Sequence, residues 1–120
     1  MLQRRYRLRS RTEIKLVFKE GKRWRHPLAV LVIRPNGENY SRFGFTASRG
    51  VGNAVMRNRA KRLLREVVRL NWSTLKPGFD CFLIARQSTS QATYLDVEQA
   101  VVTLLQRANL LNHESEAPRS

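Results

Sequence analysis

Residues 52–66 read GNAVMRNRAKRLLRE, and this stretch decides the fold because it describes one long helix with two different sides. A helical spacing of about 100° per residue gathers its apolar residues on one side, as a helix that faces a core requires. These residues are Met56, Ala60, Leu63, Leu64 and Val67. Asn53 is predicted to cap the first turn, and the helix is expected to end near Asn71.

The opposite side of this helix is almost entirely cationic. It carries Asn58, Lys61, Arg62, Arg65 and Arg69, with Arg57 and Arg59 on its flanks. Like charges four residues apart destabilise a helix, so a partner outside the helix has to compensate for them. A solvated face is the alternative, but such faces normally mix positive and negative charges. We therefore predict that this side binds a polyanion, RNA or DNA, and displaces counterions from its phosphates.

The charge of the whole chain favours the same kind of partner. Its 120 residues suffice for one domain and carry a formal net charge of +14. Residues 1–72 hold 19 lysines and arginines against 4 acids, whereas residues 73–120 hold 4 against 5. Charge alone would also allow an anionic membrane surface, but the longest apolar run, residues 28–33, is too short to span a bilayer. Cys81 is a lone cysteine, so we expect no disulfide within the chain and a cytoplasmic location.

The chain begins with a basic arm, residues 1–9, which is expected to be extended or mobile until it meets a partner. Ser10 and Glu13 then fit a capping box for a short helix over residues 11–20. Ile14 and Phe18 are four residues apart on that helix and lie on one side of it. From the residues alone they either fill a core or form the apolar edge of a groove, and the core is the more common use.

The middle of the chain predicts strands. Residues 22–26 read as a cationic connector, and residues 28–33 as a strand covered on both faces. Asn36-Gly37 is typical of a hairpin turn, which would pair that strand with the alternating residues 41–48. The loop over residues 49–53, which contains Arg49, leads into the basic helix; its backbone N–H groups could meet a phosphate, or it is a plain connection.

After the basic helix, residues 79–85 predict another strand. Thr93 and Asp96 cap a last helix whose apolar stripe runs from Val97 to Ala108. The domain is expected to cover residues 1–111, and the tail over residues 112–120 is expected to be disordered. The order is α-β-β-α-β-α, or the same with the first extended segment split into two strands, which is an α+β fold with helices packed on a small sheet.

Groups for acid–base or metal chemistry are sparse in this sequence. His26 and His113 have no carboxylate near them in the sequence, and the nine acids are scattered without the spacing of a metal site. No catalytic residue and no metal ligand are predicted. The residues alone describe a nucleic-acid-binding protein without an active site of its own.

Residues 52–65, with Arg57-Asn58-Arg59 at their centre, resemble the signature helix of the protein subunit family of bacterial ribonuclease P. The likeness extends over about residues 4–108. It includes the first helix up to Gly21, the segment from Phe43 to Arg49, and the late strand that ends in Ile84-Ala85-Arg86.

The resemblance implies a two-layer α/β sandwich of order αβββαβα with a left-handed crossover around the basic helix. It also implies a role in removing the 5′ leader of precursor tRNA, with catalysis in a large RNA that binds magnesium ions. At the matching motif positions, RNA contacts would come from Arg57, Asn58, Arg59, Lys61, Arg62 and Arg65. We predict Arg49 and Arg69 as further RNA contacts. The leader would lie in a cleft lined by Ile14, Phe18, Val30 and Val32.

Family members often have an aromatic residue where this chain has Ile14, and some have one where it has Val32, so base stacking is expected to depend mainly on Phe18. The expected partners are the ribonuclease P RNA and the precursor tRNA leader, with no membrane and no obligate protein partner. Two other functions stay open: a protein that binds ribosomal or another RNA with the same helix, and a protein-only nuclease, which the missing carboxylate cluster disfavours.

Overall fold

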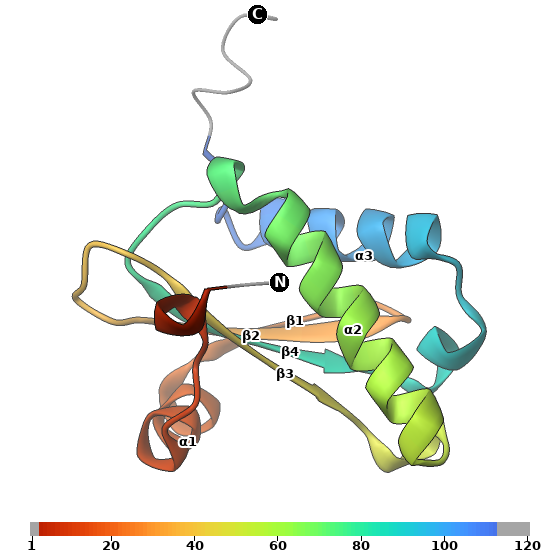
Figure 1. Ribbon diagram of the computed structural model, residues 1–120. Coiled ribbons are helices and arrows are strands. Elements are labelled where there is room, and N and C mark those ends of the chain that lie inside the picture. The colour runs from red at the N-terminus through yellow and green to blue at the C-terminus, as the bar shows by residue number, and fades with distance from the viewer. Residues whose placement is uncertain (1–2, 113–120) are drawn as a thin grey trace, which may run out of the picture.

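Each of the three α-helices in the described part of the chain begins after a residue whose side chain caps its first turn. The side chains of Ser10, Asn53 and Thr93 accept hydrogen bonds from the N–H groups of the third residue that follows. The computed structural model describes residues 3–112 (Figure 1). Its elements are α1 (Arg11–Glu20), β1 (Lys22–Arg25), β2 (Ala29–Pro35), β3 (Arg42–Ala47), α2 (Ala54–Leu70), β4 (Phe79–Ala85) and α3 (Tyr94–Arg107).

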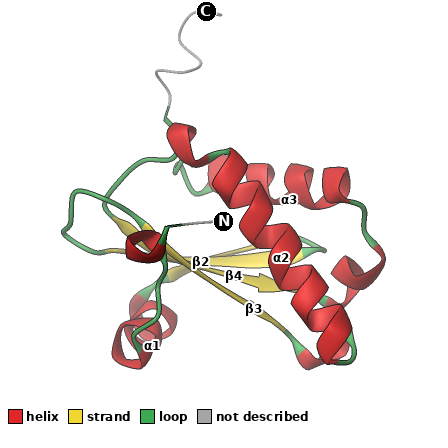
Figure 2. Cartoon of the chain, in the orientation of Figure 1, coloured by secondary structure: helices red, strands yellow, loops and turns green. Residues whose placement is uncertain are grey.

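The predicted α+β class and the order αβββαβα are confirmed. The four strands form one sheet in the order β1-β2-β4-β3, in which β4 is antiparallel to β2 and parallel to β3. Helices α2 and α3 cover one face of this sheet, and α1 lies against the other face (Figure 2). The parallel pair β3 and β4 is connected through α2, as the resemblance implied, and the hand of this crossover stays a prediction.

The predicted hairpin at Asn36-Gly37 is wrong, because β4 lies between β2 and β3. Asn36 serves a different purpose: its amide group donates hydrogen bonds to Asp80 Oδ1 at 2.9 Å and to the Tyr40 carbonyl at 3.2 Å. Gly37 does turn the chain, with φ at 73°. The turn therefore ties the loop to β4 and does not pair β2 with β3.

The hairpin of this fold is formed by β1 and β2. Residues 22–26 were predicted to be a connector, but Lys22–Arg25 is an edge strand that pairs with Val30–Ile33 of β2. His26 and Ala29 exchange backbone hydrogen bonds and close the turn. Trp24 packs against the core, so alternate side chains of β1 point to opposite faces of the sheet.

The core on the α2 and α3 side is the larger of two. From α2 it contains the fully buried residues Ala60, Leu64, Val67 and Val68, and Leu63 is half-buried at its border. Met56 was predicted to belong to this stripe but is 38 % exposed, because it lies in the first turn of α2, where it lines a surface hollow together with Gly50 and Gln87. Leu8, Val17, Val32 and Phe82 form the smaller core beneath α1.

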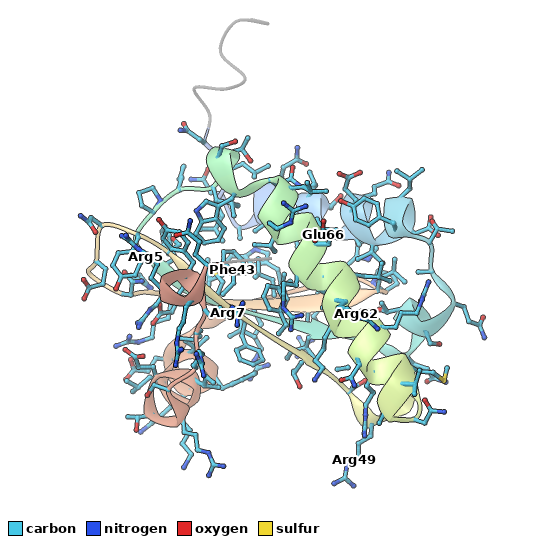
Figure 3. The ribbon with its side chains drawn as sticks, viewed as in Figure 1. Arg5, Arg7, Phe43, Arg49, Arg62 and Glu66 are labelled. Carbon is cyan, nitrogen blue, oxygen red and sulfur yellow. The ribbon has the colours of Figure 1, made fainter. Side chains whose placement is uncertain are left out.

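The basic arm is packed, which corrects the expectation of a mobile segment for the part that the structure describes. Arg7 forms a parallel bridge with Phe43, and the Leu8 N–H donates to the Phe43 carbonyl at 2.8 Å (Figure 3). Tyr6 packs on Trp72 with a centroid separation of 4.8 Å. The arm thereby covers the outer edge of β3, which would otherwise be an open sheet edge.

One expectation falls almost wholly outside the described residues. The predicted disordered tail lies outside the described residues, apart from Asn112. Among the described helices, none has the length and apolar character needed to cross a membrane.

Candidate nucleic-acid interface

The exposed side of α2 presents the cationic residues that the sequence singled out. Arg62 and Asn58 are exposed, and Lys61 is half-buried beside them. Arg49 precedes the helix, is exposed, and points away from the body of the protein (Figure 3). Within residues 3–112, no carboxylate pairs with Arg49, Lys61 or Arg62. These charges are therefore available to an anionic partner.

The start of α2 and the end of β3 enclose a small hollow. Its volume is about 260 Å³, and Arg57, Asn58 and Lys61 line it together with Ala54. Thr46 and Ala47 of β3 form the other wall. Two residues of the Arg57-Asn58-Arg59 motif are thus brought to one polar site, at the edge where α2 meets the sheet.

Arg59, the third motif residue, points to a different part of the fold. Its guanidinium donates to the Ser90 carbonyl at 3.4 Å and to the Ala92 carbonyl at 3.3 Å. These carbonyls belong to the segment that leads into α3. Arg59 therefore ties α2 to the start of α3, a role that no local sequence signal indicated because its partners are more than thirty residues away.

Arg65 and Arg69, two further predicted contacts, already have partners within the protein. The Arg65 guanidinium lies 5.6 Å from the centre of the Phe45 ring. Arg69 Nε donates to Glu66 Oε2 at 3.1 Å, and this ion pair lowers the pKa of the Glu66 carboxyl. Glu66 is an acidic residue on the otherwise cationic side of α2, and it reduces the positive charge at the last turns of this helix.

The sheet face beside α1 contains the four residues predicted to line a cleft. Ile14 and Phe18 on α1 and Val30 on β2 are half-buried at the border of the smaller core. Val32 has no exposed surface, because α1 covers it, so it can support this surface but cannot touch an RNA. The Phe18 ring lies 5.0 Å from the Phe82 ring and 5.4 Å from the Arg23 guanidinium.

A network around Arg42 fixes α1 to the sheet. Arg42 Nη1 and Nη2 bind the two carboxylate oxygens of Glu13, while Nε and Nη2 bind the two oxygens of Asp80. The hydrogen bonds to Asp80 are the main cause that raises the pKa of the Arg42 guanidinium. Glu13 completes only half of the predicted capping box, since Ser10 accepts from its N–H while its carboxylate is held by Arg42.

The same network bears on whether Glu13 and Asp80 could bind a divalent cation. All four carboxylate oxygens of Glu13 and Asp80 are bound by Arg42, so neither group is available as a ligand. Among the described residues, no three histidine, cysteine, aspartate or glutamate side chains gather at one place. These residues do not fit a magnesium site. Sequence reasoning missed this network because its three members lie far apart in the chain.

The chain is similar to known proteins along most of its length. The family model for ribonuclease P matches residues 2–109. A ribonuclease P protein component of Alkaliphilus oremlandii is 41 % identical over 106 residues, which are 88 % of this chain and 93 % of that protein. One from Herpetosiphon aurantiacus is 40 % identical over 117 residues, which are 98 % and 94 % of the two chains.

Two solved structures share the fold. The Staphylococcus aureus RNase P protein superimposes with a TM-score of 0.81 at 28 % identity, and the match covers 89 % of this chain and 98 % of that one. The RNase P protein from Thermotoga maritima gives a TM-score of 0.76 at 37 % identity, with 84 % and 96 % covered.

Proposed function

Because the chain belongs to the ribonuclease P protein family, we propose that it is the protein component of a ribonuclease P holoenzyme that removes the 5′ leader of precursor tRNA. The observation that carries the proposal is the set of cationic side chains on and before α2 that have no carboxylate partner within residues 3–112. Like charges gathered on one side repel each other in the folded domain, and a bound anion would relieve this repulsion.

We assign the catalytic RNA to the exposed side of α2. Arg49, Lys61 and Arg62 would contact phosphates directly, and Arg57 and Asn58 would receive a sugar or phosphate group in the hollow beside Thr46. Arg59, Arg65 and Arg69 would contribute mainly charge, because each guanidinium already has a contact within the protein.

We assign the leader of the precursor tRNA to the sheet face beside α1. A single-stranded RNA can stack its bases on aromatic and guanidinium planes. Phe18 with the adjacent Arg23 offers such a surface, and Ile14 and Val30 extend it with apolar side chains. Val32 would act from below by supporting Phe18 and Phe82.

Catalysis is assigned to the RNA subunit, and the magnesium ions of the reaction to sites on that RNA. The support for this assignment is that Arg42 occupies the carboxylates of Glu13 and Asp80. The polypeptide would then contribute charge and position to the holoenzyme, which we place in the cytoplasm, and no protein partner is part of the proposal.

Reconstitution with a ribonuclease P RNA at low magnesium concentration tests the proposal. We expect Arg62→Ala to weaken assembly with the RNA, whether or not the substrate carries a leader. Phe18→Ala should weaken the binding of precursor tRNA more than that of mature tRNA, by about tenfold if one stacked base is lost.

The two variants control for each other, since each leaves the other surface intact. Equal losses for precursor and mature tRNA with Phe18→Ala would reject the leader assignment. Affinity for the RNA subunit that stays flat from low to high salt would reject the assignment of α2, because each phosphate contact should lower log K with log salt by about 0.7 to 0.9. Processing of precursor tRNA by the polypeptide alone would favour a protein-only nuclease.

A further inference from the structure

Two rows of side chains cross the whole sheet on the face that α1 occupies. The register pairs Arg23 with Val32, Val32 with Phe82, and Phe82 with Gly44. Two residues further along each strand, the register pairs Arg25 with Val30, Val30 with Ile84, and Ile84 with Thr46. Directly paired residues on neighbouring strands point to the same face, so each row is continuous from β1 to β3.

Helix α1 covers the first row and leaves the second one open. Val32, Phe82 and Gly44 are buried, whereas Val30, Ile84 and Thr46 are all half-buried. The two central residues of the open row, Val30 and Ile84, therefore form an apolar floor beside α1. The whole row, from Arg25 to Thr46, spans three gaps between strands, about 14 Å at the usual strand spacing.

Both rows end in an arginine on β1. Arg23 and Arg25 alternate with Trp24, whose side chain packs in the core on the other face of the sheet. Lys22 pairs with Ile33, a residue of that same larger core, so it also points to the other face. The strand thus turns two of its three cationic side chains toward the face that carries the open row, and Arg25 stands at the end of that row.

The acids on this face are already neutralised. Glu13 and Asp80 bind Arg42, and Glu20 binds Arg34 with Nε and Oε1 2.8 Å apart. Within residues 3–112, no carboxylate pairs with Arg23 or Arg25. An anion that crosses the open row would therefore meet unopposed positive charge at the β1 edge.

The other end of the open row meets the basic helix. Thr46 is its last residue, and Thr46 also lines the hollow that Arg57, Asn58 and Lys61 form at the start of α2. One track thus leads from the motif of α2, across Ile84 and Val30, to Arg25. Positive charge stands at both ends of the track, and its floor is apolar.

From this arrangement we infer that Arg23 and Arg25 bind phosphates of the precursor tRNA leader after it has crossed the sheet from the side of α2. The inference rests on the proposed function, which it extends by a second contact point at the far edge. Apolar groups of the floor meet bases and sugars, and the guanidinium groups hold the backbone. Leaders long enough to reach β1 gain affinity from these arginines, and shorter leaders do not.

The test uses holoenzyme assembled from the full chain and a ribonuclease P RNA. Dissociation constants are measured for mature tRNA and for precursor tRNAs whose leaders lengthen one nucleotide at a time. Arg25→Ala is compared with Lys22→Ala, which removes the same charge from the same strand but on the opposite face. Arg25→Lys, which keeps the charge, shows whether a loss of affinity reflects charge or misfolding.

We expect Arg25→Ala to match wild type on mature tRNA and short leaders and to bind long leaders more weakly. The wild-type advantage on long leaders should shrink about 2.6-fold between 50 and 200 mM salt, as loss of one single-strand phosphate contact predicts. Lys22→Ala should behave as wild type, Arg25→Lys should retain most of the affinity, and Arg23→Ala with Arg25→Ala should lose more than either alone.

Other results separate the two proposals. If wild type gains affinity with leader length and Arg25→Ala gains it equally, the inference is wrong and the proposed function stands. If wild type gains nothing from any leader, the proposed leader binding itself fails. If Arg25→Ala weakens mature tRNA as much as precursor tRNA, the β1 edge contacts another part of the RNA, and the inference is overturned.

Discussion

Arg42 and Asp80 form a two-point ion pair across the parallel strands β3 and β4, with Nε–Oδ1 at 2.9 Å and Nη2–Oδ2 at 2.8 Å. The side chain of Asp80 is 2 % exposed. Arg42→Ala would leave this carboxylate buried with a single side-chain hydrogen bond, from Asn36. We expect the free energy of unfolding to fall by about 3 kcal/mol or more, as measured by urea denaturation.

Glu13→Gln is the matched control for this prediction. Glu13 is the other acid on Arg42, but its side chain is 39 % exposed, so water can replace the lost interaction. We expect a loss of about 1 kcal/mol or less. A smaller effect for Arg42→Ala than for Glu13→Gln would contradict the role given to the buried pair.

Tyr6→Ala should release the basic arm from the sheet edge while the rest of the protein stays folded. Tyr6 contacts the rings of Trp72 and Tyr40, and the Leu8 N–H that follows bonds to the Phe43 carbonyl. Loss of a ring contact worth about 1 kcal/mol should speed hydrogen exchange of the Leu8 amide about fivefold. Exchange of the Leu83 amide, in the central strand, is the internal reference and should not change.

Tyr94→Phe should stabilise the protein. The Tyr94 hydroxyl is buried and has no hydrogen-bond partner, so the fold carries a desolvated polar group that phenylalanine lacks. We expect a gain of about 1 kcal/mol in the free energy of unfolding at neutral pH. A loss of stability would show that the hydroxyl has a partner, such as a bound water.

Tyr94 should also make the free energy of unfolding depend on pH in the alkaline range. Burial, with nearby Glu98 and Glu66, raises the pKa of the Tyr94 phenol above 10.0 in the folded state. The unfolded chain therefore releases this proton at a lower pH than the folded protein does. The free energy of unfolding is unaffected by this ionisation below pH 10 and falls as the pH rises through the folded-state pKa. Urea denaturation between pH 9 and 11 should show a smaller decline for Tyr94→Phe than for wild type.

Glu66→Gln should strengthen RNA binding. Glu66 holds Arg69 and places negative charge on the cationic side of α2. Without it, Arg69 can reach a phosphate, and the slope of log K against log salt should steepen by about 0.7 to 0.9. Glu38→Gln removes the same charge from the loop between β2 and β3, so it should change the affinity for ribonuclease P RNA much less.

Local sequence signals predicted the helices well and the sheet less well. Asn53 and Thr93 were identified as caps because a cap bonds to a residue three positions away. The Asn36-Gly37 turn led to the wrong prediction of a hairpin between β2 and β3, because strand pairing depends on distant residues. In the structure β4 lies between β2 and β3, and Asn36 binds Asp80. β1 was missed because its short cationic sequence has one apolar side chain to mark it.

The candidate site was predictable in composition but not in detail. The charge of α2 follows from its sequence, yet the carbonyl partners of Arg59 and the ring beneath Arg65 come from segments distant in the chain. Burial of Val32 likewise depends on where α1 lies over the sheet. The alternation of Arg23, Trp24 and Arg25 is the one local pattern that agrees with an edge strand carrying two arginines on one face, but three residues were too few to predict it.

The position of β4 between β2 and β3 also bears on how the protein is made. A ribosome that has released only the residues before 79 has produced β1, β2, β3 and α2, but not the strand that joins them. Until β4 emerges, β2 and β3 each present an unpaired edge of the kind that invites association between nascent chains. The sheet can close only after β4 has emerged, so the basic helix cannot reach its place over the complete core before that point.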